Sequence, residues 1–552
     1  MSKSILQNKA FWLSMIALFV CGLFINLQAM FIDEGFYLSN YQTFLKDPGI
    51  NAGSIAGYLT VLVGSLWDKY FGFGGIISHR IFGQLLGCVS FYFTWRLLKE
   101  FTKYPLWIFL GCFLPMLHGI GVCMGSISGF ILGIASCFLY ESYKENSLGK
   151  YLLAAVLVGM SLFGRFTAIL TIFPLFLPTL FNLKNNRRLA LQQAFVGVGG
   201  YILGIVLVLL LIICMGHFDA YYQSIFVDLV SSGKSEGSTH NIWNLLYVYL
   251  KDVGIVFGSV FIVLLLAGLI KKYCLKNFSF YIALLIVVSG ALVLLMKVLV
   301  DKVSPIAHNY VLAVASFAFL ILSGKETIRK YDFLVAYIVL RALIGPMGSD
   351  VAILGHGCCF LSLSLPLFVS SLSEENPYRK RIIYLVLTLC LVYSAERIRR
   401  IVMFGNFWEY GPRYEMTYKL EGSKYATIFV SKETKETMDP LLFELKKYVK
   451  PDDELMCFLS IPIVHYFTET RPYTYHNCPA FYDPDLFCKR LHKAEKEKPL
   501  LPVVVVEKLS EKLEGANKIK YECLKDFMNR HRYRQVWQNE KYIILVPSSQ
   551  SK

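Results

Sequence analysis

Two adjacent carboxylates, Asp33 and Glu34, directly follow the apolar stretch 11–32. If that stretch crosses a membrane, both acids lie at the membrane surface, where neighbouring negative charges are costly unless a ligand or a reaction uses them. Arg80 opens the next apolar stretch, in the segment Ser78–Gly87. An Arg in such surroundings costs about 3 kcal/mol unless an anion or a carboxylate pairs with it. Proton transfer by the acids and anion binding by the cation are therefore the chemistry that these residues could provide.

Further basic side chains lie near the ends of later apolar stretches and could extend an anion site: Arg165, Lys297, Lys302 and His308. Each cation also has an interpretation that requires no ligand. Arg80 could pair with one of the two acids, and Lys297 could extend its ammonium group to the membrane surface. Arg165 could be an isolated cation in a turn, and His308 could be a hydrogen-bonded residue at the interface. Asp33 could be a solvated carboxylate at a helix end.

Apolar stretches of about 20 residues must position these side chains, and each can cross roughly 30 Å of hydrocarbon as a helix. The composition agrees, with 55% hydrophobic residues, 17% charged residues and a mean hydropathy of +0.50. We predict membrane-spanning helices over 11–32, 76–97, 105–123, 127–141, 150–164, 167–182, 194–216, 253–270, 279–299, 308–323, 332–346, 352–371 and 383–402. No such stretch follows Phe404. The fold class is therefore a polytopic α-helical membrane region over 1–404, with about 11–13 spans, and a separate region over 405–552.

The positive charges indicate the orientation of these helices. The formal net charge of +16 is spread in short clusters between apolar stretches rather than on one tail, which argues against a nucleic-acid partner. Lys and Arg gather in alternate loops, and the positive-inside rule then places the N-terminus in the cytoplasm. The segments 33–75, 217–252 and 405–552 fall outside the cytoplasm of a bacterial-type inner membrane. Three arginines are exceptions to this alternation because they fall on the outer side, where they could bind lipid headgroups: Arg397, Arg399 and Arg400.

Two outer segments differ from simple connections. In the first outer loop, Phe36–Leu45 and Ile55–Tyr70 are amphipathic and suit helices that lie in the membrane interface. The alternative is that 52–71 spans the membrane, which would invert the topology downstream. The loop 217–252 is longer than a connection requires, so it is either a lid over an active face or a disordered connector.

The region after Phe404 has the pattern of an α/β domain. Short β-branched and apolar runs predict strands at Tyr425–Ser431, Glu454–Ser460, Pro502–Glu507 and Tyr542–Val546. A helix is expected between the first two strands, over Glu433–Val449. Cys478 and Cys488 lie in this domain and either form a disulfide or remain free thiols.

Several motifs occur in an order that resembles the GT-C superfamily of membrane glycosyltransferases. They are Asp33-Glu34 after the first span, the paired interfacial helices, the Arg in Ser78–Gly87, Gly-Arg-Phe-Thr at 164–167, His308-Asn309-Tyr310 at a late span, and the outer C-terminal domain. More narrowly, the chain is similar to glycosyltransferase family 39 and its relatives, the protein O-mannosyltransferases and the aminoarabinose transferases that modify lipid A.

The resemblance implies inverting transfer of a sugar from a polyprenyl-phosphate donor to a lipid, glycan or protein acceptor on the outer face of the membrane. Asp33 would be the general base, and Glu34 would orient the acceptor or tune Asp33. The donor phosphate would be bound by Arg80, Arg165, Lys297, Lys302, His308 and Tyr310. Tyr37 and Asp350 would lie on the acceptor side.

A divalent cation, Mg or Mn, is uncertain. Several relatives carry an acidic residue between the third and fourth spans, where this chain has His118–Ser126 without a carboxylate. Asp350 could substitute, although an Asp in a Gly-rich turn needs no metal. Two other functions remain open from the sequence: a transporter or flippase for a lipid-linked glycan, and a scaffold or sensor whose outer domain binds a partner.

Overall fold

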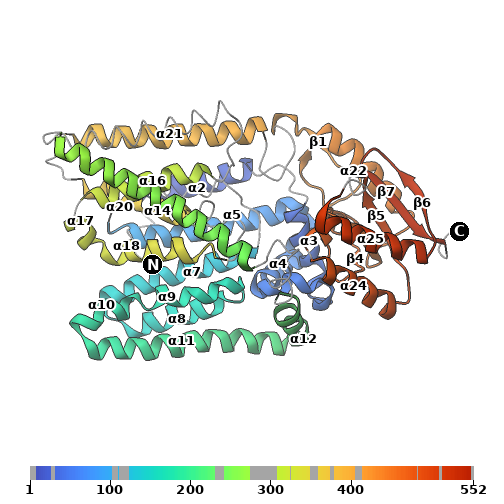
Figure 1. The fold of residues 1–552 in the computed structure, drawn as a ribbon, viewed down its shortest axis with the longest axis horizontal. Coiled ribbons are helices and arrows are strands. Elements are labelled where there is room, and N and C mark those ends of the chain that lie inside the picture. Colours follow the sequence, from blue (N-terminus) through green and yellow to red (C-terminus); the bar gives the residue numbers. More distant parts are fainter. Residues whose placement is uncertain are drawn as a thin grey trace.

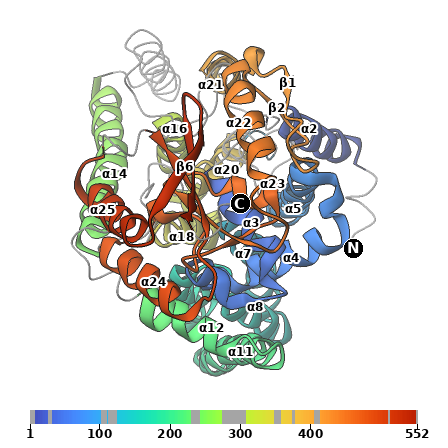
Figure 2. The ribbon, with the colours of Figure 1, turned by 90° about the vertical axis from the view of Figure 1, so that its right-hand side faces the viewer.

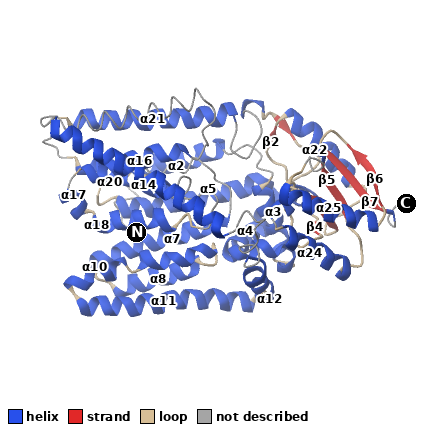
Figure 3. Ribbon diagram, in the orientation of Figure 1, coloured by secondary structure: helices blue, strands red, loops and turns tan. Residues whose placement is uncertain are grey.

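The computed structural model describes residues 8–25, 32–101, 108, 110, 124–229, 242–273, 307–323, 325–347, 358–372, 378–404, 413–481, 483–508 and 513–548. The chain is mostly helical, and a sheet-containing domain forms one end of the long axis (Figures 1 and 3). Most of the longer helices run along that axis, away from the sheet (Figure 1). The predicted spans 105–123 and 279–299 lie largely or wholly outside the described residues.

The first half of the helical region contains the elements that surround Asp33 and Arg80. Its helices are α2 (Lys9–Ile25), α3 (Asp33–Phe44), α4 (Tyr58–Phe71), α5 (Gly75–Leu98), α7 (Met124–Glu145), α8 (Leu148–Ser161), α9 (Ile172–Leu175), α10 (Leu177–Asn185), α11 (Arg187–Cys214) and α12 (Phe218–Tyr222). Short 3-10 segments are η1 (Pro48–Gly57), η2 (Gly72–Gly74) and η3 (Phe166–Thr171), and η4 (Gln223–Leu229) is a π-helical turn.

The second half of the helical region is described in shorter pieces. It comprises α14 (Ile242–Tyr273), α16 (Ala307–Leu322), α17 (Lys325–Lys330), α18 (Asp332–Ile344), α19 (Cys358–Leu361), α20 (Ser364–Ser371) and α21 (Arg379–Phe404). Among the described residues, four helical segments are long and apolar enough to cross a membrane: Tyr58–Leu98, Ala168–Asn185, Arg187–Cys214 and Ile242–Leu266.

Helices α8 and α11 pack closely because glycines replace side chains at their contact. A Cβ added to Gly159 would lie 2.2 Å from the carbonyl oxygen of Tyr201, and one added to Gly204 would lie 2.1 Å from that of Val156. Small residues at such contacts let two backbones approach, which is the usual way in which apolar helices associate in lipid.

The C-terminal domain is an α/β unit with a five-stranded sheet of order β4-β3-β5-β7-β6. Its elements are η6 (Arg413–Glu415), β1 (Tyr418–Lys419), β2 (Phe429–Val430), α22 (Lys432–Leu445), β3 (Glu454–Phe458), α23 (Ile463–Thr468), β4 (Arg471–Pro472), η7 (Pro479–Phe481), α24 (Pro484–Glu497), β5 (Val503–Glu507), α25 (Gly515–Arg530), β6 (Tyr533–Gln538) and β7 (Tyr542–Pro547). Strand β3 is parallel to β4 and β5, whereas β7 is antiparallel to β5 and β6. The predicted strands at β3, β5 and β7 are therefore present.

The predicted strand Tyr425–Ser431 is wrong over most of its length. Only Phe429–Val430 pairs, antiparallel to Tyr418–Lys419 and outside the main sheet. The preceding residues turn back onto the start of α5: the carbonyl oxygen of Tyr425 accepts from the backbone N–H of Ile76 at 3.1 Å, and the Thr427 hydroxyl donates to the carbonyl oxygen of Gly74 at 2.9 Å. The carbonyl oxygen of Tyr425 is thus used by the helical region, so it is not available for a sheet.

One apolar core extends across the boundary between the two regions. Leu38 and Tyr41 of α3 belong to the same buried cluster as Met438 of α22, Ile463 of α23 and Val503 of β5. The other face of the sheet has a core of its own, which includes Phe458, Phe487 and Phe527. Figure 2 looks onto the sheet domain and shows α3 and α23 together near its centre.

Candidate functional site

Glu34 and Arg80 form a buried ion pair where α3 meets α5. The Arg80 Nε donates to Glu34 Oε1 at 2.8 Å, and Nη2 donates to Oε2 at 2.6 Å. The side chains are 9% and 4% exposed. Two parallel, charge-assisted hydrogen bonds fix both groups in direction as well as distance. The pairing is the alternative that the sequence left open for Arg80, and it occupies two of the donors that a phosphate would use.

Asp33 is the first residue of α3 and lies directly before this pair. Its position is half-buried, unlike the enclosed ion pair. The N-terminal turn of a helix stabilises a carboxylate through the helix dipole. Because the charge of Arg80 neutralises Glu34, the repulsion that Glu34 would exert on Asp33 is reduced. Asp33 thus lies at the N-terminal end of α3, beside an acid whose charge is already balanced by Arg80.

A second buried pair, which the sequence analysis missed, lies next to the first. His79 Nε2 is 2.9 Å from Asp68 Oδ1, and His79 is 2% exposed. The ring of Tyr41 stacks on His79 with centroids 5.7 Å apart, and Tyr466 approaches edge-on at 6.3 Å. Polar residues in otherwise apolar helices, Asp68 in α4 and His79 beside Arg80 in α5, were the signal that could have revealed it.

The C-terminal domain holds α3 in place from its outer side. The Asn477 side-chain amide donates to the carbonyl oxygen of Phe36 at 2.7 Å, to Asn40 Oδ1 at 3.3 Å, and to the Ser39 hydroxyl. Gly35 lies so close to α23 that a Cβ there would be 2.5 Å from the backbone nitrogen of Ile463. The domain thus sets the position of the helix that begins with Asp33.

The remaining predicted site residues are described unevenly. Arg165 is the half-buried residue before η3, and Tyr37 lies in α3 with its ring edge-on to Phe36 at 5.1 Å. His308 and Tyr310 are placed on the first turn of α16. Three predicted residues lie outside the described part of the chain: Lys297, Lys302 and Asp350.

The described part of the loop 217–252 contacts the C-terminal domain. Asp228 in η4 pairs with Arg490 in α24, and their side chains are 4% and 9% exposed. Burial raises the pKa of the Asp228 carboxyl, and the Arg490 charge opposes this effect. At the start of the loop, His217 Nδ1 lies 3.1 Å from the Tyr58 hydroxyl. The Gly- and Ser-rich part of this loop, within 230–241, lies outside the described residues.

Cys478 and Cys488 are free thiols. Cys478 is fully buried, and its Sγ lies 3.8 Å from the carbonyl oxygen of Leu459. Cys488 of α24 lies beside Cys523 of α25, whose thiol holds the pKa of Cys488 below its usual value. The structure therefore places a different cysteine next to Cys488 than the sequence suggested.

No group of three or more His, Cys, Asp or Glu side chains with the spacing of a metal site occurs among the residues that the structure describes. Asp350, the residue proposed as a substitute metal ligand, is not among them. The question of a divalent cation therefore stays where the sequence left it.

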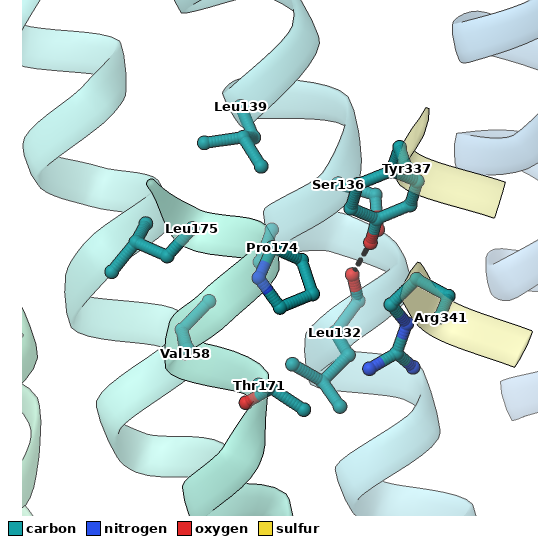
Figure 4. Close-up of a pocket in the computed structure, with 10 residues that line it drawn as sticks. Leu132, Ser136, Leu139, Val158, Thr171, Pro174, Leu175, Tyr337 and Arg341 are labelled. Atoms are coloured by element: carbon teal, nitrogen blue, oxygen red, sulfur yellow. Dashed lines mark hydrogen bonds between the residues drawn. The ribbon is translucent and has the colours of Figure 1, made fainter. Parts of the chain in front are cut away.

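A pocket among the helices contains a second buried arginine that the sequence analysis missed. The pocket lies between α7, α8, α9 and α18, and its polar lining residues are Ser136, Thr171, Tyr337 and Arg341. Arg341 is 5% exposed, and its guanidinium group lies over the Phe360 ring, 4.8 Å from the centroid. Figure 4 shows the guanidinium group turned toward Leu132 and Thr171. A single Arg inside the apolar stretch 332–346 was the available signal.

The sequence matches no model of a known protein family, and no curated protein matches it.

Proposed function

We propose that the chain is a membrane glycosyltransferase of the GT-C type, which transfers a sugar from a polyprenyl phosphate to a lipid, glycan or protein acceptor outside the cytoplasm. The observation that carries the proposal is the position of Asp33. It is the half-buried first residue of α3, and it stands beside the enclosed Glu34–Arg80 ion pair where the helical region meets the C-terminal domain.

A membrane location is the first part of the proposal. Four described helical segments are long and apolar enough to cross a membrane, and the loops alternate in positive charge. With the N-terminus in the cytoplasm, the junction of α3, α5 and the sheet domain would lie at the outer surface. A lipid-linked donor and an acceptor could meet there.

In the proposed reaction, the Asp33 carboxylate takes the proton of an acceptor hydroxyl as its oxygen attacks the anomeric carbon of the sugar. The bond between that carbon and the phosphate oxygen breaks, and its electron pair leaves with the polyprenyl phosphate. Attack from the face opposite the leaving group inverts the anomeric configuration. Glu34, held by Arg80, would keep α3 in register rather than act on substrate directly.

The negative charge that grows on the departing phosphate needs cationic partners. Because two donors of Arg80 are used by Glu34, we assign this role first to Arg165, with Lys297, Lys302 and His308 as the further candidate cations and Tyr310 as a candidate neutral hydrogen-bond donor. Tyr37 of α3 is the candidate for contact with the acceptor. Asp350 is the candidate for binding a metal or the acceptor.

The test uses purified protein, a radiolabelled polyprenyl-phosphate sugar and membrane extract as the source of acceptor. Asp33→Asn should reduce transfer by at least about a thousandfold because the amide cannot take the proton. Asp526→Asn, the same change at an exposed position on α25, should retain full transfer. Retained turnover by Asp33→Asn with unchanged expression would overturn the assignment of the base.

The alternative function that the sequence left open is the transport of a lipid-linked glycan, for which the membrane region would have to provide a pathway. The two functions differ in their products, since only the transferase releases free polyprenyl phosphate. If labelled donor crosses vesicle membranes containing the protein and no lipid phosphate is released with any acceptor, the transporter is correct.

A further inference from the structure

The pocket that contains Arg341 is enclosed mainly by apolar side chains. Leu132 and Leu139 of α7, Val158 of α8, and Pro174 and Leu175 of α9 form its walls. Arg341 reaches into it from α18, as does Tyr337 one turn earlier (Figure 4). None of the ten residues that line the pocket is acidic. A positive charge is thus placed in an apolar space whose walls offer no carboxylate.

The contacts of the guanidinium group leave it incompletely satisfied. Its Nη1 is buried and makes no hydrogen bond within the described part of the chain. The Arg341 Cζ lies over the Phe360 ring, 4.8 Å from the ring centroid. Such a cation–π contact attracts the charge of the guanidinium group, but the ring is not a conventional hydrogen-bond acceptor. The buried Nη1 donors therefore remain for a ligand.

The hydroxyl groups of the pocket do not provide the counter-charge that Arg341 needs. Ser136 Oγ donates to the carbonyl oxygen of Leu132 at 2.6 Å, so the Tyr337 hydroxyl next to it must donate its own proton to Ser136. Thr171 Oγ1 donates to the carbonyl oxygen of Ala168 at 2.5 Å. The protons of all three hydroxyls are committed, and none of these groups can neutralise a charge.

We propose that Arg341 and this pocket bind one small monovalent anion of the size of chloride. A buried ion that lacks a counter-charge is strongly unfavourable, and an anion at the N–H groups of Arg341 would both accept their hydrogen bonds and neutralise the site. Water could accept the hydrogen bonds but would leave the charge. The inference is independent of the proposed glycosyltransferase activity.

The size and charge of the pocket select the ligand. The pocket offers about 10 Å³ of room, on the scale of a water-sized sphere, which is far less than the roughly 300–1,000 Å³ of sites for drug-sized ligands. A sugar or an isoprenoid chain is therefore too large. Arg341 is the only cation among the lining residues, so a divalent anion would leave an excess negative charge in the same apolar space.

The first test measures thermal unfolding of the purified full chain in detergent while chloride replaces gluconate at constant ionic strength. A ligand that binds only the folded protein raises the unfolding temperature with its concentration. Between about 1 mM and about 200 mM chloride we expect a rise of roughly 2 °C. Equilibrium dialysis with radiolabelled chloride should give about one bound ion per chain.

Matched variants show whether Arg341 is responsible. Arg341→Met should abolish both the chloride-dependent rise and the bound label, and Arg341→Lys, which keeps the charge, should retain part of both. Lys380→Met, which removes an exposed cation at the start of α21, should behave as the unchanged chain and controls for general salt effects.

Other results would overturn the proposal of an anion bound to Arg341. If the unchanged chain neither binds label nor responds to chloride, the pocket holds water and the proposal is wrong, whatever the variants do. If Arg341→Met still binds chloride, or Lys380→Met loses the response, the anion lies elsewhere. Should Arg341→Met fail to fold, the dialysis of the unchanged chain and of Arg341→Lys still decides.

Discussion

Arg80 and Arg341 are almost equally buried, at 4% and 5% exposure, yet their surroundings differ. Arg80 lies where the C-terminal domain covers the helices, and a carboxylate takes two of its hydrogen bonds. Arg341 lies among the helices, above a phenyl ring and beside apolar walls. Arg80 therefore has its counter-charge within the chain, whereas none of the residues that line the Arg341 pocket supplies one and the proposed anion would provide it.

The largest effect is expected when the Glu34–Arg80 ion pair is broken. Arg80→Met leaves Glu34 buried without a counter-charge and should destabilise the chain by about 3–5 kcal/mol. Adding Glu34→Gln should recover most of the loss. Arg341→Met leaves no carboxylate behind, so without chloride it should be neutral or stabilising. Unfolding midpoints in one detergent compare all three, and equal losses for the two Arg variants would contradict the distinction.

Two glycine variants test how tightly the junction is built. Gly35→Ala forces a Cβ against the backbone of Ile463 and should cost about 1–3 kcal/mol, because neither helix can yield freely. Gly87→Ala, in α5, meets no atom within 4 Å and should stabilise by about 0.5–1 kcal/mol. Protease sensitivity of the C-terminal domain should rise only for Gly35→Ala. If both variants behave alike, the contact of α3 with α23 is looser than described.

Acid should weaken the C-terminal domain through two buried histidines. Burial lowers the pKa of His465 to about 3, and burial together with the charges of Arg490 and Lys520 lowers the pKa of His476 well below its usual value. The unfolded chain binds these protons near pH 6.5, so stability falls below that pH by up to about 1.4 kcal/mol per unit per histidine. For His465 the loss continues until about pH 3.

Unfolding midpoints between pH 7 and pH 5 measure this loss. The carboxyl of Asp452, whose pKa is lowered mainly by its hydrogen bond to Lys46, loses its contribution only below about pH 4, outside that range. His465→Gln should flatten the slope, and an unchanged slope would exclude His465 as a source.

The smallest effect is expected from an exposed pair at the same junction. Lys46 lies 3.1 Å from Asp452, with side chains 62% and 48% exposed. Lys46→Ala should cost no more than about 1 kcal/mol, and added salt should remove the difference. A larger, salt-independent loss would show that the contact is more enclosed than these exposures indicate.

Local pattern predicted the short apolar strands β3, β5 and β7 close to where they occur. Helix α3 also occurs close to the segment Phe36–Leu45 where a helix was expected, although its buried residues include Ser39, Asn40 and Thr43 and it is not amphipathic. Strand β6 was missed because none of its residues is buried and they do not alternate regularly, and β4 because it has only two residues. Helices α24 and α25 are rich in charge and were not predicted, although each buries one face.

For the candidate site, the sequence pointed to residues but did not determine how they pair. It placed Asp33, Glu34 and Arg80 at the ends of apolar stretches, and it left open which acid Arg80 would meet. Which acid Arg80 meets depends on how α3 is rotated about its axis. The contacts of α3 with the C-terminal domain, at Gly35 and Asn477, fix this rotation. Arg341 went unnoticed because α18 forms its pocket together with α7, α8 and α9, which lie more than 150 residues earlier in the chain.

The shared core of α3 and the sheet has a consequence for biosynthesis. The Asn477 side chain donates to the carbonyl oxygen of Phe36, which lies 441 residues earlier in the chain. The backbone N–H of Ile76 donates to the carbonyl oxygen of Tyr425. The segment around Asp33 leaves the ribosome early and cannot reach its final position until nearly the whole protein has been made. Chains that stop short of the sheet would keep apolar surface on α3 exposed, a mark by which cellular proteases can distinguish unfinished molecules from complete ones.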